Sequence, residues 1–423
     1  MKKFDKTKIL AVSDSLCGTT GFGRITKSIV TSLPKDKYEI QAIGYNIPAM
    51  MQPFKNIIFE DNTKIENILQ HPGGLGAYAI DRVPIVTKKF RQHITFVLLD
   101  TFMLLEAGYK NIDFMSKFCM YFPSDGEPFP VDPNKGDCGD ILRKSHPYGV
   151  AMSKFAQEQV KRLYGLDVHY IPHSTDSDLF KPIEDDEKER LRDEWIVFNC
   201  YNQPLRGVLK NKIIILAVFR NQPRKNPGDY QIIAEELFRE LKTNKLANDV
   251  IFLLNTDVND PAMAGFRIHL SLLTQMFGLQ NKVFFTGMSV VEGLTELKMG
   301  ELYQLADIYF APTSGEGFNV TLIEAMSAGL PCVSTAYTTT KELITDHRAG
   351  FGVAVDRYIV GTWNVKRAFI SVSDAVNKLI LLIENEGLRK RLGTNGRKAV
   401  LEHYEHKVVM PQWDKHFSFM REN

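Results

Sequence analysis

The chain has 423 residues, of which 44% are hydrophobic and 24% are charged, and its formal net charge is +2. This composition is typical of a globular protein of about two or three domains, and it excludes a disordered or fibrous chain. The near-neutral charge argues against nucleic acid as a partner, because surfaces that bind nucleic acid are strongly basic.

Cysteine usage and the N-terminal segment bear on the compartment. The five cysteines are odd in number and form no Cys-x-x-Cys pair. This argues against a disulfide framework and a zinc site, and it favours a reducing environment. The N-terminal segment lacks the apolar stretch of a signal peptide, and no apolar run is long enough to span a membrane. We therefore expect a cytoplasmic protein and leave peripheral contact with a membrane open.

Short runs rich in β-branched and aromatic residues alternate with amphipathic segments through the first half. Many of these runs are apolar throughout, as in parallel strands that are buried on both faces. Strands are expected at 8–15, 38–46, 56–60, 93–100, 118–125, 149–153 and 168–174. The charged segment 183–195 then interrupts the alternation, and it predicts a solvated helix near a domain boundary.

The same alternation resumes in the second half. Strands are expected at 212–219, 249–255, 282–287, 307–313, 331–335 and 350–355, with helices such as 227–241 and 373–392. The repetition predicts an α/β protein with two Rossmann-like, doubly wound domains. We place the N-terminal domain at residues 1–185 and the C-terminal domain at residues 207–400. Because ligands bind outside the carboxyl ends of such strands, loops that follow strands should line a cleft between the domains.

The first strand leads into a turn that contains Gly18, Gly21 and Gly23, just ahead of a helical pattern. Free N–H groups at the start of a helix favour an anion such as phosphate. The spacing matches neither the dinucleotide-binding fingerprint nor the P-loop. The alternative, that these glycines only permit a tight strand–helix turn, stays open.

A basic loop follows the predicted strand 212–219, with Arg220, Arg224 and Lys225 close together. Three cations at the carboxyl end of a strand suit a diphosphate, because Arg binds phosphate as a fork and Lys as a point charge. Composition alone favours an ordinary solvated loop as the alternative.

The segment 313–335, TSGEGFNVTLIEAMSAGLPCVST, predicts a turn followed by a helix that starts near Phe318 or Asn319. Glu316 lies in the turn and Glu324 lies on the helix. At 1.5 Å per residue their separation is roughly 12 Å, comparable with the reach from the sugar to the ribose of a nucleotide-sugar. One carboxylate could bind sugar hydroxyls and the other the ribose. The neighbours of Glu324 are apolar, so its carboxylate should need partners.

These residues resemble the retaining glycosyltransferases of the GT-B fold, and in particular the large family 4, the glycosyl transferases group 1. The family's hallmark is a pair of glutamates separated by seven residues in an E-G-F-G-type turn and helix, which Glu316 and Glu324 fit. The resemblance covers most of the chain, and it is strongest in the second half. The other segments that carry it are 168–182, 218–236, 282–344 and 410–417.

The resemblance implies an enzyme that moves a sugar from a nucleotide-diphosphate sugar to an acceptor hydroxyl, with retention. Glu316 would contact the donor sugar near its anomeric carbon, and Glu324 would hold the ribose. Arg220 and Lys225 would neutralise the departing diphosphate. The turn and helix start would line the donor site through Gly317, Phe318, Asn319 and Val320, and Gly21 and Gly23 would close over the phosphates or the acceptor. The N-terminal domain would bind the acceptor and receive a C-terminal crossing helix at 405–423.

The chain departs from the family pattern in the second half and at the domain boundary. Thr338 and Thr339 replace the Gly-Gly pair that precedes a glutamate, Ser174 replaces another glycine, and Asn319 replaces the glycine after Glu-Gly-Phe. Asn tolerates unusual φ values, so the last change is compatible with the expected turn.

The first half lacks a counterpart of the family's active-site histidine. Asp125 is the candidate replacement, as a hydrogen-bond acceptor for the donor sugar or the acceptor hydroxyl, with Asp100 as a weaker one. The alternative for Asp125 is a plain Asp-Gly turn. His173 lies at a strand end and is expected to contribute to the donor site, and the alternative is a structural histidine with satisfied hydrogen bonds.

Metals and other functions complete the expectations. The Asp-x-Asp sequence at 176–178 matches the motif of metal-dependent transferases, but it lies in the segment that ends the first domain, so we expect no metal and no other cofactor. The partners expected are a nucleotide-sugar donor and an acceptor that is a glycan, a lipid or a protein. Alternative functions are a sugar-nucleotide epimerase, a non-catalytic sugar-nucleotide or glycan-binding protein, and a DNA-modifying glucosyltransferase.

Overall fold

The computed structural model describes residues 5–18, 20–55, 57–58, 64–243, 246–260, 265–289 and 293–423. The chain divides into two compact units, which are described here one at a time. Unit 1 comprises Met1–Ser174, Val360–Lys366 and His406–Asn423, and unit 2 comprises Thr175–Ile359 and Arg367–Glu405. The sequence placed the end of the first domain at residue 185, whereas this division follows Ser174.

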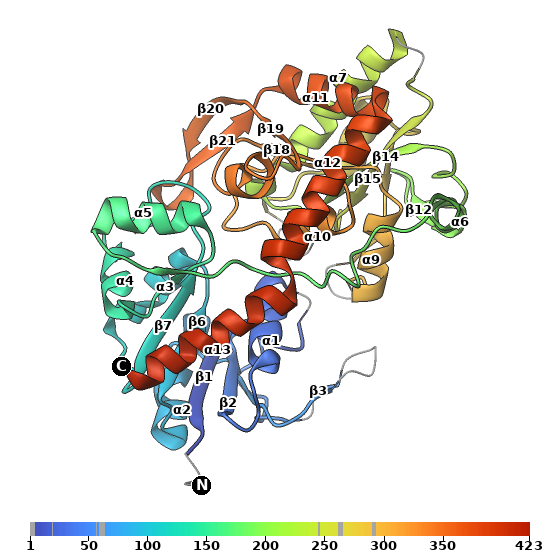
Figure 1. The fold of residues 1–423 in the computed structure, drawn as a ribbon. Coiled ribbons are helices and arrows are strands. Elements are labelled where there is room, and N and C mark those ends of the chain that lie inside the picture. Colours follow the sequence, from blue (N-terminus) through green and yellow to red (C-terminus); the bar gives the residue numbers. More distant parts are fainter. Residues whose placement is uncertain are drawn as a thin grey trace. The chain divides into compact units, whose positions relative to one another are not determined.

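Unit 1 is built on a seven-stranded sheet in which every pair of neighbours is parallel (Figure 1). The strand order is β11-β10-β7-β6-β1-β2-β5. The strands are β1 (Thr7–Ser13), β2 (Tyr38–Gly44), β5 (Leu69–Pro72), β6 (Ile94–Leu98), β7 (Lys117–Phe122), β10 (Val150–Ala151) and β11 (His169–Tyr170).

Two edge features of unit 1 differ from the sequence prediction. The strand expected at 56–60 is seen as β3 (Ile57–Ile58), which pairs with β4 (Lys64–Ile65) outside the main sheet, and its other positions lie outside the described residues. Strand β5 was not predicted, because its sequence Leu-Gln-His-Pro has no β-branched residue and ends in proline. Two further short strands, β8 (Val131–Asp132) and β9 (Gly136–Asp137), form a separate hairpin.

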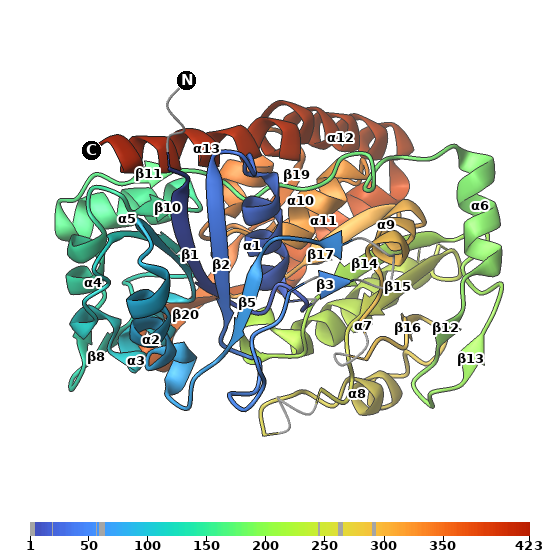
Figure 2. The same cartoon turned by 90° about the horizontal axis from the view of Figure 1, so that it is seen from below.

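Helices cover both faces of the unit 1 sheet, because its central strands are apolar on both sides. Four helices pack on the face that carries Val12, Val97 and Met120; they are α2 (Arg82–Phe90), α3 (Thr101–Ala107), α4 (Gly139–Ser145) and α5 (Lys154–Tyr164). The opposite face carries Phe96, which contacts Trp413 of α13 (His406–Glu422) edge-on at 5.3 Å between ring centroids. Figure 2 shows α13 and α2 on opposite sides of this sheet. Helix α1 (Gly21–Ser32) contacts α13.

Unit 2 is built on an eight-stranded sheet with the order β13-β12-β16-β15-β14-β17-β18-β19. Only the edge pairings of β12 with β16 and with β13 are antiparallel. The strands are β12 (Val197–Phe198), β13 (Pro204–Leu205), β14 (Ile213–Val218), β15 (Val250–Asn255), β16 (Val283–Phe285), β17 (Ile308–Ala311), β18 (Cys332–Thr335) and β19 (Gly350–Val353). A separate hairpin joins β20 (Val355–Val360) and β21 (Lys366–Ile370).

One face of this sheet forms a core with α7 (Pro227–Thr243), α8 (Leu270–Met276) and α11 (Val372–Glu384). Helix α10 (Val320–Ser327) contacts β17, β18 and α12 (Glu386–Ala399), and α9 (Glu296–Gln304) precedes β17. The single helix expected at 373–392 is therefore two. Asn385 separates α11 from α12, and its side chain caps α12 by accepting a hydrogen bond from the N–H of Leu388.

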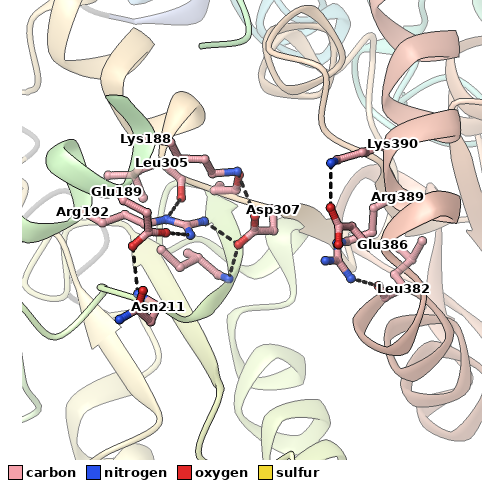
Figure 3. Close-up of polar contacts among 12 residues, drawn as sticks. Lys188, Glu189, Arg192, Asn211, Leu305, Asp307, Leu382, Glu386, Arg389 and Lys390 are labelled. Carbon is pink, nitrogen blue, oxygen red and sulfur yellow. Dashed lines mark hydrogen bonds and ion pairs between the residues drawn. The ribbon is translucent and has the colours of Figure 1, made fainter. Parts of the chain in front are cut away.

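The charged segment 183–195 forms α6 (Asp185–Glu194), but it is not solvated throughout. Figure 3 shows Lys188 and Arg192 of α6 directed at Asp307, with N···O distances of 2.8 Å and 2.6 Å. Arg192 is only 5% exposed, and its Nε donates to the carbonyl of Leu305. Burial alone would raise the pKa of Asp307, but the two cations lower it. The helix is thus attached to the rest of unit 2 by two ion pairs with Asp307, which composition could not reveal.

Candidate functional site

The order of strands in unit 2 reverses between β14 and β17. From β14 the chain proceeds outward through β15 and β16, and from β17 it proceeds the other way through β18 and β19. Ligands of parallel sheets bind at such a switch point, beyond the carboxyl ends of the strands. Arg220, Arg224 and Lys225 follow β14, and Glu316 follows β17, so these four predicted residues lie on the two loops that flank the switch point.

Glu316 is the centre of this arrangement. Its carboxylate is paired on both oxygens: Oε2 lies 2.6 Å from Nη1 of Arg224, and Oε1 lies 2.6 Å from Nζ of Lys225. The side chain of Glu316 is only 8% exposed. Arg224 also donates to the carbonyl of Gly315 at 3.0 Å, so the guanidinium spans the turn.

The charge state of Glu316 follows from these contacts. Burial alone would raise the pKa of the Glu316 carboxyl, but the adjoining Arg224 and Lys225 lower it to about 2. The carboxylate is therefore ionised at neutral pH. One carboxylate faces two cations, so the cluster retains an excess of positive charge at the switch point.

Two further segments hold the turn that carries Glu316. The backbone N–H and the hydroxyl of Ser314 both donate to the carbonyl of Arg224 at 2.9 Å. From the other side, the N–H of Glu316 donates to Oγ1 of Thr338 at 3.0 Å, and the hydroxyl of Thr339 donates to the carbonyl of Phe318 at 3.0 Å. The threonines that replace the family's glycines are thus hydrogen-bonded to the turn.

Thr338 adopts a φ of 50°, in the left-handed region. A β-branched residue rarely occupies this region, because its Cβ substituents crowd the backbone. Such strain persists only where surrounding contacts impose it, and it is concentrated at functional sites. Asn319, with a φ of 83°, is a second left-handed residue of the site and immediately precedes α10, which begins at Val320 and close to the expected position.

Glu324 lies on α10 and is 1% exposed. Its Oε2 accepts a hydrogen bond from the hydroxyl of Tyr303 on α9, at 2.9 Å. The carboxylate therefore has the partner that its apolar surroundings require. Tyr303 is completely buried and was not singled out from the sequence.

Arg220 lies on the same loop as Lys225 but has a different partner. Its Nε lies 2.6 Å from Oδ2 of Asp260, and its Nη2 lies 3.3 Å from Oδ1, so the pair is bidentate. Asp260 is fully buried, whereas the side chain of Arg220 is 40% exposed. The sequence reasoning missed Asp260, and its only signal was an aspartate shortly after a predicted strand.

The predicted residues of unit 1 lie on loops and strand ends of that unit. Asp125 is partly buried in the loop after β7, where Ser124 Oγ donates to the carbonyl of Gly126 at 3.0 Å. His173 is 4% exposed, and its Nδ1 lies 2.7 Å from the hydroxyl of Tyr121. Burial lowers the pKa of His173 to about 3, so the ring is neutral at neutral pH.

The glycine-containing turn of unit 1 leads directly into α1, which begins at Gly21. The hydroxyl of Thr20 caps the helix by accepting a hydrogen bond from the N–H of Gly23. A Cβ atom on Gly23 would lie 2.5 Å from the carbonyl oxygen of Ser15, so close packing requires glycine there. A Cβ on Gly21 would meet no atom within 4 Å.

The described residues contain neither a cluster of metal ligands nor a membrane-spanning helix. Among the residues that the structure describes, no three or more His, Cys, Asp or Glu side chains form a group that could hold a metal ion. In the Asp-x-Asp sequence, Oδ1 of Asp176 accepts a hydrogen bond from the N–H of Asp178 at 2.9 Å, within a local turn. None of the described helices combines the length and apolar character needed to cross a bilayer.

Comparison with known proteins identifies relatives of parts of this chain. The model of the family described as glycosyl transferases group 1 matches residues 228–361. D-inositol 3-phosphate glycosyltransferase 2 of Catenulispora acidiphila is 27% identical over 202 residues, which cover 46% of this chain and 42% of that protein. Phosphatidyl-myo-inositol mannosyltransferase of Mycobacterium tuberculosis is 32% identical over 108 residues, which cover 25% and 26%. The chain thus spans about a quarter of the mannosyltransferase and less than half of the other relative.

Solved structures resemble the chain over nearly its whole length. Sucrose-phosphate synthase of Thermosynechococcus elongatus has a TM-score of 0.70 at 14% identity, covering 98% of this chain and 99% of that one. The HepE protein of Anabaena, in a crystal structure with UDP and glucose, has a TM-score of 0.67 at 14% identity, covering 98% and 100%. These likenesses confirm the predicted fold class, two doubly wound α/β units of the GT-B type.

Proposed function

Residues 228–361 belong to the glycosyl transferases group 1, and on this premise we propose that the protein moves a sugar from a nucleotide-diphosphate sugar to an acceptor hydroxyl. The observation that carries the proposal is the buried Glu316 carboxylate between Arg224 and Lys225 at the switch point of the unit 2 sheet. It is supported by the HepE protein, which has the same fold and was crystallised with UDP and glucose.

The cations of the site bind the diphosphate of the donor and stabilise it as it departs. Their charge exceeds that of Glu316, so the cluster attracts an anion, and Arg224 and Lys225 are fixed before it arrives. Charge that develops on a departing diphosphate is stabilised best by cations that need no reorganisation. Arg220, oriented by Asp260, adds a third cation on the same loop.

The two glutamates bind the uncharged parts of the donor, its sugar and its ribose. Glu316 stays ionised at neutral pH, so it accepts hydrogen bonds from hydroxyl groups of the donor sugar and does not act as a general acid. Glu324, held by Tyr303, binds the ribose hydroxyls. Retention of configuration at the anomeric carbon is the finer part of the proposal, and it rests on the resemblance of the Glu316–Glu324 segment to retaining enzymes.

The experiment is a thermal-shift series with UDP, GDP, ADP and their glucose and mannose conjugates, followed by an assay for nucleotide release. A true ligand raises the midpoint once its concentration exceeds its dissociation constant. We expect one nucleotide series to do so, and Glu316→Gln to reduce release from the sugar conjugate by about a hundredfold or more. The control is Glu240→Gln, which changes an exposed glutamate on α7 of the same unit.

Product analysis completes the test. NMR of the product should show a new glycosidic bond with the donor's anomeric configuration. An epimerised donor in the absence of any acceptor, or the absence of a midpoint shift with every nucleotide, would overturn the proposal. Unchanged release by Glu316→Gln would remove Glu316 from the reaction.

A further inference from the structure

Unit 1 has a switch point of its own. From β1 the chain proceeds outward through β2 and β5, and then returns to β6 on the other side of β1 before it continues through β7. Asp14 follows β1, and Asp100 follows β6. By the rule that placed the site of unit 2, a ligand of unit 1 belongs beyond the carboxyl ends of β1 and β6.

Strand register brings a tyrosine to the same place. Ser13 is paired with Gly44 of β2, and the N–H of Tyr45 donates to the carbonyl of Ser13 at 3.0 Å. Tyr45 therefore stands beside Asp14. Burial raises the pKa of the Tyr45 phenol above its ordinary value, and the charge of Asp14, its hydrogen bond with the phenol, and the charge of Asp100 raise it further. Both carboxylates thus act on the phenol.

Asp14 is the unusual member of this group. It is 7% exposed, and its carboxyl group is hydrogen-bonded to the phenol of Tyr45, whereas its Oδ1 has no hydrogen-bond partner among the described residues. A buried carboxylate oxygen without a donor is costly, and native structures seldom leave one in that state. The first turn of α1 lies close to Asp14, because a Cβ on Gly23 would lie 3.5 Å from Cβ of Asp14. No described N–H group of this turn donates to Oδ1 of Asp14. The oxygen lacks a donor that a ligand can supply.

A second tyrosine completes the cluster. The rings of Tyr45 and Tyr78 lie 5.4 Å apart with an edge-on geometry, and the hydroxyl of Tyr78 donates to Oε2 of Glu106 at 3.2 Å. Tyr78 and its neighbour Ala79 both have positive φ values, 51° and 62°. Two consecutive non-glycine residues in this region store backbone strain, which is typical of ligand-binding loops.

The chemistry of the cluster selects the ligand. Carboxylates only accept hydrogen bonds, so they favour a molecule rich in hydroxyl donors. The three carboxylates of this region, Asp14, Asp100 and Glu106, repel a phosphate. Tyrosine presents an apolar ring together with a polar tip, which suits a ring with C–H faces and hydroxyl edges. We infer that Asp14, Tyr45, Tyr78 and Asp100 bind the acceptor of the transfer, and that this acceptor is a neutral polyhydroxylated ring, a sugar or a cyclitol. Its role as an acceptor site rests on the proposed function.

The test measures binding of simple probes to the whole chain in the presence of saturating UDP, or of whichever nucleotide raises the midpoint. Saturation-transfer NMR would use methyl α-glucoside, methyl α-mannoside, N-acetylglucosamine and myo-inositol, with glucose 6-phosphate as the anionic comparison. We expect at least one neutral probe to bind, and the phosphorylated sugar to bind at least tenfold more weakly than its neutral counterpart. Octyl glucoside distinguishes a free sugar from a lipid-linked one, because tighter binding than the methyl glycoside indicates a lipid-linked acceptor.

Variants assign the probe to the cluster. Asp14→Asn and Tyr45→Ala should weaken binding of the neutral probe about tenfold or more, with an unchanged midpoint shift by the nucleotide. The matched controls are Tyr164→Phe, at a half-buried tyrosine on α5 of the same unit, and Asp167→Asn, at an exposed aspartate. Tyr45→Phe retains the ring, so it separates the contribution of the ring from that of the hydroxyl.

The outcomes separate this inference from the proposed function. If the nucleotide binds but no neutral probe does, or if Asp14→Asn and Tyr45→Ala bind the probe as the wild type does, the acceptor site is wrong and the proposed function stands. Preferential binding of glucose 6-phosphate would also overturn it. If no nucleotide binds but a neutral probe depends on Asp14, the polyol site stands and only its role as an acceptor site is lost.

Discussion

Glu316 and Lys225 are 91 positions apart in the chain, yet Nζ of Lys225 lies 2.6 Å from Oε1 of Glu316. Arg224 occupies the other carboxylate oxygen at the same distance. The two loops that follow β14 and β17 are therefore joined by charge at the switch point of the sheet. The stability of folded unit 2 therefore depends on Glu316 being ionised.

Acid should weaken this contact in a defined pH range. The folded pKa of Glu316, about 2, is below the ordinary value of 4.5. A carboxyl group with a lowered folded pKa stabilises the fold above its unfolded pKa, and the contribution is lost as pH falls through the folded pKa. The contribution is on the order of 3 kcal/mol, lost between about pH 4.5 and about pH 2.

The measurement is urea unfolding of the wild type and Glu316→Gln at several pH values. The difference in unfolding free energy between the two proteins should narrow as the pH falls from about 6 to about 3. Glu240→Gln, which alters an exposed side chain, serves as the control. A difference that stays constant over this range would contradict the assignment of the pKa shift to Glu316.

The strained backbone of Thr338 gives a second prediction. Thr338→Ala loses the hydroxyl that accepts the N–H of Glu316 and keeps most of the strain at positive φ. It should destabilise the protein by about 1–2 kcal/mol. Thr338→Gly also loses the hydrogen bond but relieves the strain, so it should be the more stable of the two. Thr338→Ser should unfold close to the wild type. Denaturant midpoints test this order, and a glycine variant less stable than the alanine variant would refute it.

The glycines at the start of α1 should respond differently to the same change. Gly23→Ala places a methyl group 2.5 Å from the carbonyl oxygen of Ser15, which forces a backbone shift that costs about 1–3 kcal/mol. Gly21→Ala enters open space and should leave stability unchanged or raise it by about 0.5–1 kcal/mol. Thermal midpoints of the two variants decide the matter, and equal destabilisation would show that the turn differs from the described geometry.

Arg220 and Asp260 should act on nucleotide binding as one unit. Arg220→Ala should weaken binding of the nucleoside diphosphate identified in the thermal-shift series by about tenfold, because one cation is lost. Asp260→Asn should weaken this binding less, since the Arg220 guanidinium remains but loses its bidentate partner. In a double-mutant cycle the second change should add little to the first. Calorimetric titration measures the dissociation constants, and additive effects would indicate that Asp260 does not orient Arg220.

Much of the fold could be predicted because its signals are local. The apolar runs that became β14, β15 and β17 are β-branched or aromatic and end at recognisable turns, so their order and type follow from neighbouring residues. The helix that carries Glu324 could be placed to within about two residues for the same reason. Strand β5 has none of these signals, and its place in the sheet depends on pairing with β2.

The partners of the site residues could not be predicted, because they are set by the folded chain. Asp260 is 40 positions from Arg220, and Glu316 is 92 positions from Arg224. No spacing rule connects such pairs. Composition also could not separate Arg192, buried against Asp307, from the solvated charges that surround it in α6. The strain at Thr338 depends on a backbone angle, which the replacement of a glycine suggests but does not determine.

The path of the chain through unit 1 has a consequence for biosynthesis. Phe96, on one face of its sheet, is covered by Trp413 and Phe417 of α13. A nascent chain can assemble the strands of unit 1 early, but the part of that face around Phe96 lacks its cover until residues 406–422 have left the ribosome. All of unit 2 is synthesised in the meantime. The half of the protein that is made first is thus completed last, and during translation its uncovered aromatic face is a natural target for chaperones.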